Sequence, residues 1–142
     1  MWRYAGIVVA GLLGGCAATS SGVEQTLIGV ASKTFTEPLQ TVHDATIESL
    51  TRMAMDVVEQ QETTQGRHIR AMVARRTIDI DLERLSDNAT YMRVVATKPE
   101  LMFRDSATAT EVIIQTAQTV QDHKARVAEA TKATNTRSLR TR

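Results

Sequence analysis

The stretch RHIRAMVARRTIDIDLERL, residues 67–85, alternates apolar and polar side chains in two successive runs. Side chains at every second position of an extended chain share one face, and the apolar ones here are Ile69, Ala71, Val73, Ile78, Ile80 and Leu82. The stretch therefore predicts two antiparallel strands, 67–74 and 77–85, joined by a two-residue turn at Arg75-Arg76. This register pairs Val73 with Ile78. Because tight turns prefer Asn or Gly, a wider loop is the alternative.

The flanking residues extend the same pattern. A strand over 55–62 precedes the stretch, and a turn at 86–88 leads to a strand over 89–97. The inward residues of this last strand, Met92, Val94 and Ala96, then oppose Leu82, Ile80 and Ile78. The sequence predicts a four-stranded meander with one apolar face.

Two further segments have a helical period instead. Residues 38–54 carry an apolar stripe joined by His43 and Thr46, with Pro38 in the first turn and Thr36 as N-cap. The stripe consists of Leu39, Val42, Ile47, Leu50, Met53 and Ala54.

Asp105-Ser106 is a good N-cap pair for a second helix, which we expect to continue through Val127 before it frays. Its stripe consists of Ala109, Val112, Ile113, Thr116, Ala117 and Val120. Residues 26–36 are rich in β-branched side chains and predict a first strand. The fold class is therefore α+β, a two-layer sandwich with two helices on one face of an antiparallel sheet, in the order β-α-β-β-β-β-α.

The first sixteen residues have the pattern of an export signal. Arg3 gives a short positive region, residues 5–13 are apolar, and Leu13-Gly14-Gly15-Cys16 follows. This resembles the lipobox of bacterial lipoproteins, which implies cleavage after Leu13-Gly14-Gly15 and a covalent diacylglycerol and N-acyl lipid on Cys16. Cys16 is the one cysteine of the chain, so an internal disulfide is excluded.

Two alternatives compete with the lipobox. A membrane-spanning helix needs about 20 apolar residues, whereas Thr19, Ser20 and Ser21 interrupt this run. A plain signal peptide cut near Ala17-Ala18 is the other. Ala17, by resemblance to enterobacterial sorting, favours the periplasmic face of the outer membrane over the inner membrane.

The runs FTEPLQTVHDATIESLTRM, residues 35–53, and FRDSATATEVIIQT, residues 103–116, flank the meander. With the lipobox, this arrangement resembles an uncharacterised family of small bacterial lipoproteins with one small α/β envelope domain. The resemblance covers roughly residues 30–121 and the leader. It implies no catalytic residues.

The formal charge of +1 conceals a division along the chain. Residues 16–123 carry ten basic and fifteen acidic side chains, whereas 124–142 carry six basic and one acidic. We therefore expect a removed signal peptide (1–15), a flexible tether (16–25), an α+β domain (26–123) and a basic tail (124–142) that is partly helical or disordered.

The tail has two interpretations. Lys132, Arg137, Arg140 and Arg142 are candidates for contact with anionic lipid headgroups or acidic cell-wall polymers. A solvated end without a partner is the alternative.

Catalytic and metal chemistry find little support in the sequence. The acidic row Asp79, Asp81 and Glu83 could hold a cation or act as acid and base, but the expected register places Asp81 between Arg70 and Arg93 in an ordinary charge ladder.

The three histidines are dispersed: His43 lies in the apolar stripe of a helix, His68 opposes Glu83, and His123 lies near the tail. We expect no metal and no cofactor.

The sheet face away from the helices would show Met72, Tyr91 and Val95 among Arg70 and Arg93. Such mixtures occur at protein interfaces, although scattered apolar residues need no partner. The sequence favours a lipid-anchored envelope protein with a non-catalytic binding or scaffolding domain and an envelope protein as partner, without nucleic acid. A small-ligand or lipid carrier using the groove between helices and sheet is the alternative, and a hydrolase is the third.

Overall fold

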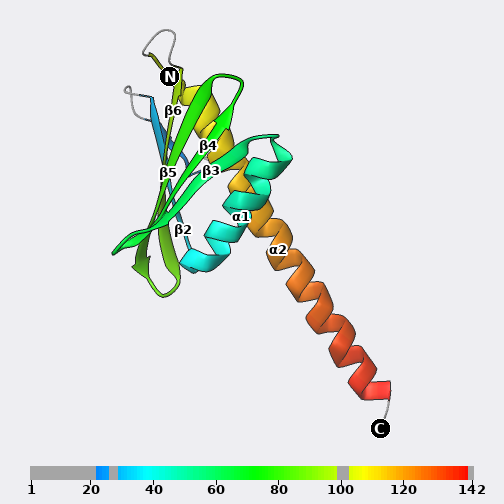
Figure 1. The fold of residues 1–142 in the computed structure, drawn as a ribbon. Helices are drawn as coiled ribbons and strands as arrows, with labels where there is room; N and C mark the ends of the chain where they lie inside the picture. Colours follow the sequence, from blue (N-terminus) through cyan, green and yellow to red (C-terminus); the bar gives the residue numbers. More distant parts are fainter. Residues whose placement is uncertain (1–21, 26–28, 99–102, 141–142) are drawn as a thin grey trace, which may run out of the picture.

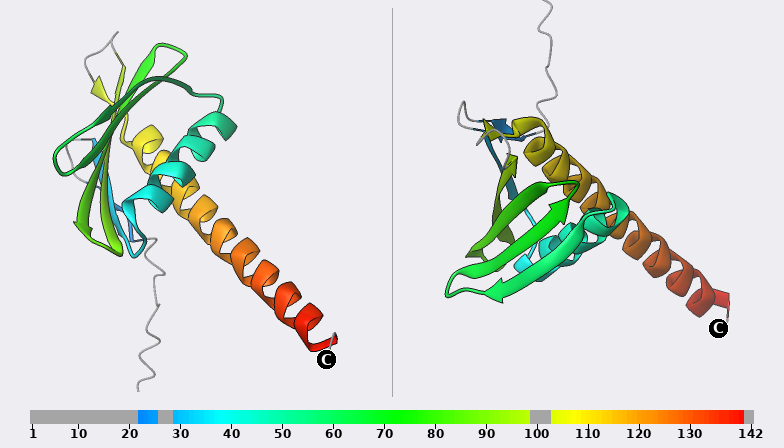
Figure 2. Two further views of the ribbon diagram at one scale, coloured as in Figure 1. Left: turned by 60° about the horizontal axis from the view of Figure 1, so that its bottom comes forward. Right: turned by 45° about the horizontal axis from the view of Figure 1, so that its top comes forward.

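A computed structural model describes residues 22–25, 29–98 and 103–140 and shows one antiparallel sheet with two helices on one of its faces (Figures 1 and 2). The elements are β1 (Glu24–Gln25), β2 (Val30–Phe35), α1 (Leu39–Arg52), β3 (Asp56–Glu62), β4 (Gly66–Val73), β5 (Arg76–Ser86), β6 (Ala89–Lys98), β7 (Phe103–Arg104) and α2 (Ser106–Arg140). The predicted α+β class and the order of the five longer strands and two helices are confirmed. The two short strands β1 and β7 were not predicted.

The order of strands in the sheet is β1-β2-β6-β5-β4-β3, with β7 also paired to β6. The meander β3 to β6 is as predicted, and every pairing in it is antiparallel. Strand β2 pairs with β6, at the far side of the meander from β3. Helix α1 therefore carries the chain across the sheet from β2 to the opposite edge.

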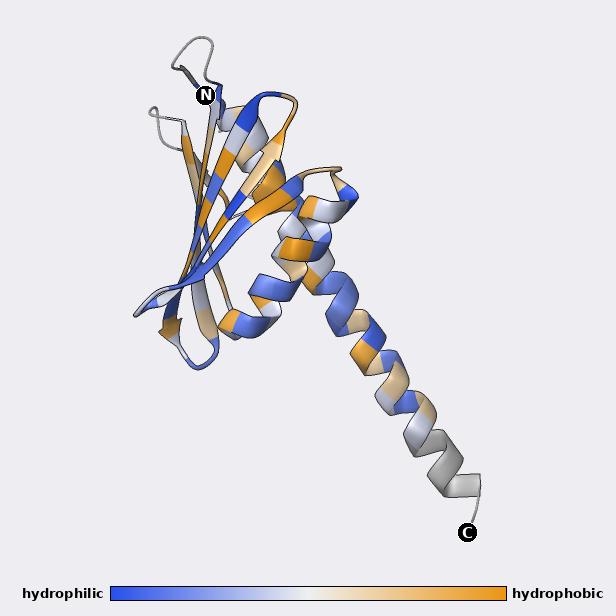
Figure 3. Ribbon diagram, viewed as in Figure 1, coloured by the Kyte–Doolittle hydropathy of each residue, from blue (hydrophilic) through white to orange (hydrophobic). Residues whose placement is uncertain are grey.

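The core lies between the inner face of the sheet and the helices. The alternating apolar residues of the meander are buried there, with Val73 partly buried at the end of β4. They are Ile69, Ala71, Ile78, Ile80, Leu82, Met92, Val94 and Ala96. Helix α1 contacts β3 to β6, and α2 contacts β2 and β6. In Figure 3, orange residues gather on the strands and on the parts of the helices beside the sheet.

The turn between β4 and β5 differs from the prediction. The two turn residues are Ala74 and Arg75, with φ of 39° and 66°, and Val73 pairs with Arg76. Both residues occupy the left-handed region that a tight hairpin turn requires, although neither is Gly or Asn. The predicted pairing of Val73 with Ile78 is therefore wrong by two positions, and Ile78 pairs with Ala71. Since two positions is one full period, the same side chains still point inward.

The ends of the helices are capped in different ways. Helix α1 has Pro38 as its N-cap residue, without a side-chain cap. The predicted cap by Thr36 is wrong, because the Thr36 hydroxyl donates to Glu37 instead. For α2 the predicted cap is confirmed: Asp105 accepts hydrogen bonds from the backbone N–H of Thr108 (3.1 Å) and from its hydroxyl (2.9 Å).

Helix α2 is longer than predicted. It runs without interruption to Arg140 instead of fraying after Val127. Its second half extends beyond the sheet and α1 in every view (Figures 1 and 2), and each described side chain from 124 to 134 is exposed.

Asp105 also joins the start of α2 to the sheet. Its side chain is only 10% exposed and lies 3.0 Å from Arg76 Nε of β5 and 3.1 Å from Lys98 Nζ of β6. Burial raises the pKa of Asp105, but the hydrogen bonds from Thr108 and the contact with Lys98 outweigh it and lower the pKa to about 2. The ionised carboxylate is thus favoured by the folded state.

We predict that Asp105→Asn lowers the free energy of unfolding by about 2 kcal/mol at neutral pH, because the amide keeps the cap but loses the charge. In the unfolded chain this carboxyl titrates near 3.8, so its stabilisation is complete above that pH and disappears as the pH falls through about 2. Urea unfolding across this range measures the effect. Asp122→Asn, exposed on the same helix, is the control and should change little; an equal loss at every pH would contradict the assignment.

Candidate functional site

All five residues predicted for a partner surface lie on the face of the sheet opposite the helices. The register places Arg70 and Met72 of β4 on this face, together with Tyr91, Arg93 and Val95 of β6. Met72 is 44% exposed, Arg93 is exposed, and the other three are half-buried. The described helices leave this face open to solvent (Figure 2).

A ladder of charges crosses the open face. Arg70 lies at its centre: its Nε donates to Asp79 Oδ1 of β5 (2.8 Å), and its Nη1 donates to Glu59 Oε2 of β3 (3.0 Å). The hydrogen bond to Asp79 and the charges of Asp79 and Glu59 raise the pKa of Arg70. The prediction that Arg70 lies opposite Asp81 is wrong, because the turn at Ala74-Arg75 shifts β4 against β5.

His68 takes the position beside Asp81. Its Nδ1 lies 2.7 Å from Asp81 Oδ1, and its Nε2 lies 3.6 Å from Asp79 Oδ1. The predicted placement of His68 opposite Glu83 is therefore wrong for the same reason as for Arg70. The prediction for the other side of Asp81 is confirmed, since Arg93 of β6 is its register partner. Basic side chains thus flank the acidic row, as in a solvated cross-strand ladder.

The apolar residues of the open face do not form one patch. Met72 pairs with Thr77 towards the β4–β5 turn, whereas Tyr91 pairs with Glu83 towards the other end of the sheet. Val95 pairs with Asp79 between them. The structure therefore brings the predicted residues to one face and places the charge ladder among them.

Tyr91 also borders a hollow of about 220 Å³ at the β2 end of this face. The hollow is lined by Gly22, Ser32, Lys33, Thr34 and Tyr91. Sequence reasoning missed it, because the pairing of β2 with β6 involves residues more than fifty positions apart.

His43 is buried, as its place in the apolar stripe of the helix predicts, and it lies between α1 and β3. Both of its ring nitrogens have a partner: Nδ1 lies 3.1 Å from Asp44 Oδ1, and Nε2 lies 3.1 Å from Gln60 Oε1. Burial raises the pKa of Asp44, but hydrogen bonds from Gln40 and His43 outweigh it, and the net shift is downward. Within residues 22–25, 29–98 and 103–140, no group of three or more His, Cys, Asp or Glu side chains is placed to hold a metal ion.

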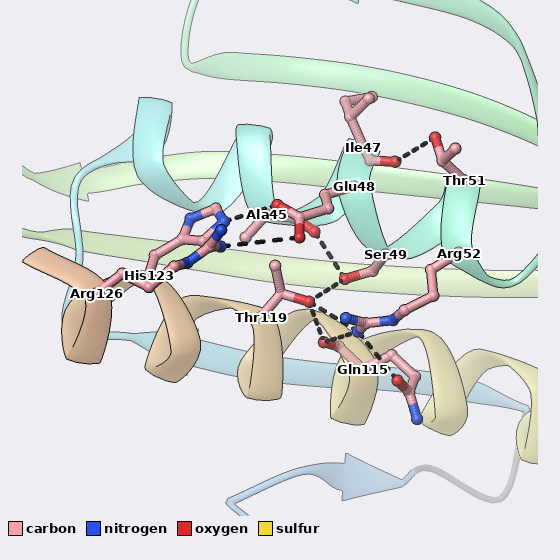
Figure 4. A network of polar contacts seen from close by, with 10 residues as sticks. All are labelled: Ala45, Ile47, Glu48, Ser49, Thr51, Arg52, Gln115, Thr119, His123 and Arg126. Carbon is pink, nitrogen blue, oxygen red and sulfur yellow. Dashed lines mark hydrogen bonds and ion pairs between the residues drawn. The ribbon is translucent and has the colours of Figure 1, made fainter.

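Polar contacts join α1 to α2 where the two helices face each other (Figure 4). Thr119 of α2 accepts from Arg52 Nη2 (2.8 Å) and lies 2.9 Å from Ser49 Oγ. One turn further along, His123 Nε2 lies 2.7 Å from Glu48 Oε2. The hydrogen bond with His123 is the main reason that the pKa of Glu48 is lowered.

Two more ion pairs follow at the point where α2 leaves the domain. Lys124 pairs with Glu37, whose side chain is only 7% exposed, and Arg126 Nη2 lies 3.9 Å from Glu48 Oε1. The first basic residues of the predicted tail are therefore held against α1. The sequence carried no signal for these contacts, which join positions about eighty residues apart.

The other predicted tail residues extend beyond the domain. Lys132 is exposed on α2, and Arg137 and Arg140 lie in the last turns of the helix, for which only the backbone is described. Arg142 and the lipobox residues Leu13, Gly14, Gly15 and Cys16 lie outside the described residues. None of the described helices is both long enough and apolar enough to cross a membrane.

No protein-family model matches the chain, and no curated protein matches it in sequence. The resemblance to small bacterial lipoproteins therefore stays a prediction.

We predict that Arg70→Gln leaves the urea midpoint of unfolding nearly unchanged, because its ion pairs are exposed to solvent and screened. The same substitution at Arg76 should lower the midpoint, since Arg76 contacts the buried carboxylate of Asp105. Unfolding of both variants in one buffer measures the difference. An equal loss in the two variants would mean that the ladder on the open face is a structural feature and not a surface free to bind.

Proposed function

We propose that this protein is a lipid-anchored bacterial envelope lipoprotein whose domain is a non-catalytic binding or scaffolding module on the periplasmic face of the outer membrane. The anchor is supported by Leu13-Gly14-Gly15-Cys16, where the one cysteine of the chain stands at the lipobox position. Two or three acyl chains on one residue are enough for stable anchoring.

The observation that carries the binding function is the open face of the sheet. An uncovered face that combines an exposed methionine, a tyrosine and two arginines has the residue types that are enriched at protein interfaces. Arg70 is held in a fixed position by Glu59 and Asp79, so a partner would lose little of its binding energy to the ordering of that side chain. We propose an envelope protein as the partner.

A small-ligand or lipid carrier is less well supported. Such a carrier would use the space between helices and sheet, but Leu50, Ile80 and Ile113 are completely buried there in a packed core. A hollow of about 580 Å³ lies at the turn between β3 and β4, outside this space, and its lining is mostly polar. For a hydrolase, the third possibility, no arrangement of described residues offers support.

We predict that Cys16→Ser moves the protein from the membrane fraction of the cells to the soluble fraction, because the acyl chains can no longer be attached. Fractionation followed by immunoblotting measures the change. Ser20→Ala, in the adjoining segment, is the control and should leave the protein in the membrane fraction. A Cys16→Ser variant that stays with the membrane would contradict the anchor.

For the binding module, crosslinking in cells should trap one dominant protein partner, and Tyr91→Ala with Arg93→Glu should abolish the product. Gln118→Ala with Gln121→Glu, exposed on α2 at the helix side, is the control and should keep it. Co-purification of a small molecule that survives the substitutions at Tyr91 and Arg93 would favour the carrier instead.

A further inference from the structure

The described chain begins at the same end of the domain at which α2 leaves it. Gly22 lies against Lys33 and Thr34 near the end of β2, as lining of the hollow beside Tyr91. Lys124 pairs with Glu37, two residues after the end of β2. Helix α2 starts at the opposite end of the domain, where Asp105 N–H donates to Ala96 O near the end of β6. It therefore runs towards the end at which Gly22 lies.

Beyond this point, residues 127–140 form a helical extension that we call the C-terminal arm. With a rise of 1.5 Å per residue, it is about 20 Å long. The six residue-to-residue steps from Cys16 to Gly22 span at most about 20 Å when fully extended. The arm is therefore as long as the longest possible tether, and both leave one end of the domain.

The arm is basic, and its residues differ in helix propensity. Residues 127–140 contain Lys132, Arg137 and Arg140 against the single acid Glu129, and Arg142 follows in the sequence. Thr131 and Thr134 turn their hydroxyls back to the carbonyls of Val127 and Ala130 (2.9 and 3.0 Å), and threonine is a poor helix former.

The arm has no apolar stripe with which to enter a bilayer. Val127 is 66% exposed, and Leu139 is the only other large apolar residue of the arm, about 120° away around an ideal helix. In Figure 3 the coloured part of the arm, up to residue 134, is mostly blue, white and tan. Contact with a surface would therefore be electrostatic and peripheral.

We propose that the C-terminal arm binds the anionic phospholipid headgroups of the same membrane in which Cys16 is anchored. The proposal rests on the lipid anchor proposed above, since the tether brings the arm to that surface. Basic residues near an anionic bilayer each strengthen binding about fivefold. The ion pairs of Glu37 and Glu48 with α2 fix the direction of the arm, so binding holds the domain in one orientation above the membrane.

Vesicle co-sedimentation tests the proposal with the chain from residue 16 carrying Cys16→Ser, which retains every described residue and cannot be acylated. We expect binding to vesicles of phosphatidylethanolamine with phosphatidylglycerol, little binding to phosphatidylcholine, and loss of binding at about 0.5 M salt. Arg137→Gln with Arg140→Gln should weaken binding about 25-fold. Lysine at both positions should preserve it.

The matched control is Arg75→Gln with Arg104→Gln, which removes two charges at the other end of the domain and should change binding less than about twofold. Equal losses in the two pairs, or binding that is indifferent to lipid charge, would overturn the proposal. So would retention on purified cell-wall sacculi without binding to vesicles. Because these measurements use the unacylated chain, their failure is distinct from failure of the anchor, which the fractionation of Cys16→Ser reports.

Discussion

Every second side chain along the middle of β4, β5 and β6 is apolar, and the inner face that these residues form must be removed from water. Burial of each isoleucine or leucine contributes about 1.5–3 kcal/mol, more than any ion pair on the surface of this domain. One helix is too narrow to cover the face. Helix α1 covers the part beside β3 to β6, and α2 covers the part beside β2 and β6. The positions of both helices follow from this requirement.

The inner residues could be predicted from sequence because an error of two positions in strand pairing, one full period of a strand, leaves the same side chains on the inner face. The pairing of β4 with β5 is displaced by two positions from the expected one, and Ile69, Ile78 and Ile80 are buried all the same. The same error does change which side chains on the outer face are cross-strand neighbours. The positive φ values of Ala74 and Arg75 determine them, and no glycine or asparagine marks these residues as a turn. The prediction therefore found the residues of the open face but assigned Arg70 and His68 to the wrong acids.

Other features depend on contacts between distant positions. The β-branched residues of 26–36 predict a strand there but not its neighbour in the sheet, because the pairing of β2 with β6 requires α1 to cross the whole sheet. The length of α2 was underestimated for another reason. Its last turns contain threonine and asparagine, which favour helix weakly, beside alanine, lysine and arginine, which favour it well. Basic residues near the C-terminus of a helix also favour it through the helix dipole.

The basic segment 124–142 has two parts with different roles. The first part contacts the domain: His123 and Arg126 pair with Glu48, and Lys124 pairs with Glu37. Some of the acidic excess of the domain is therefore neutralised directly by the basic segment. The remaining basic residues lie beyond these contacts. Since the contacts hold α2 against α1, the domain and not the arm's own sequence determines where the arm points. A surface that binds the arm would consequently also determine which way the open face of the sheet is turned.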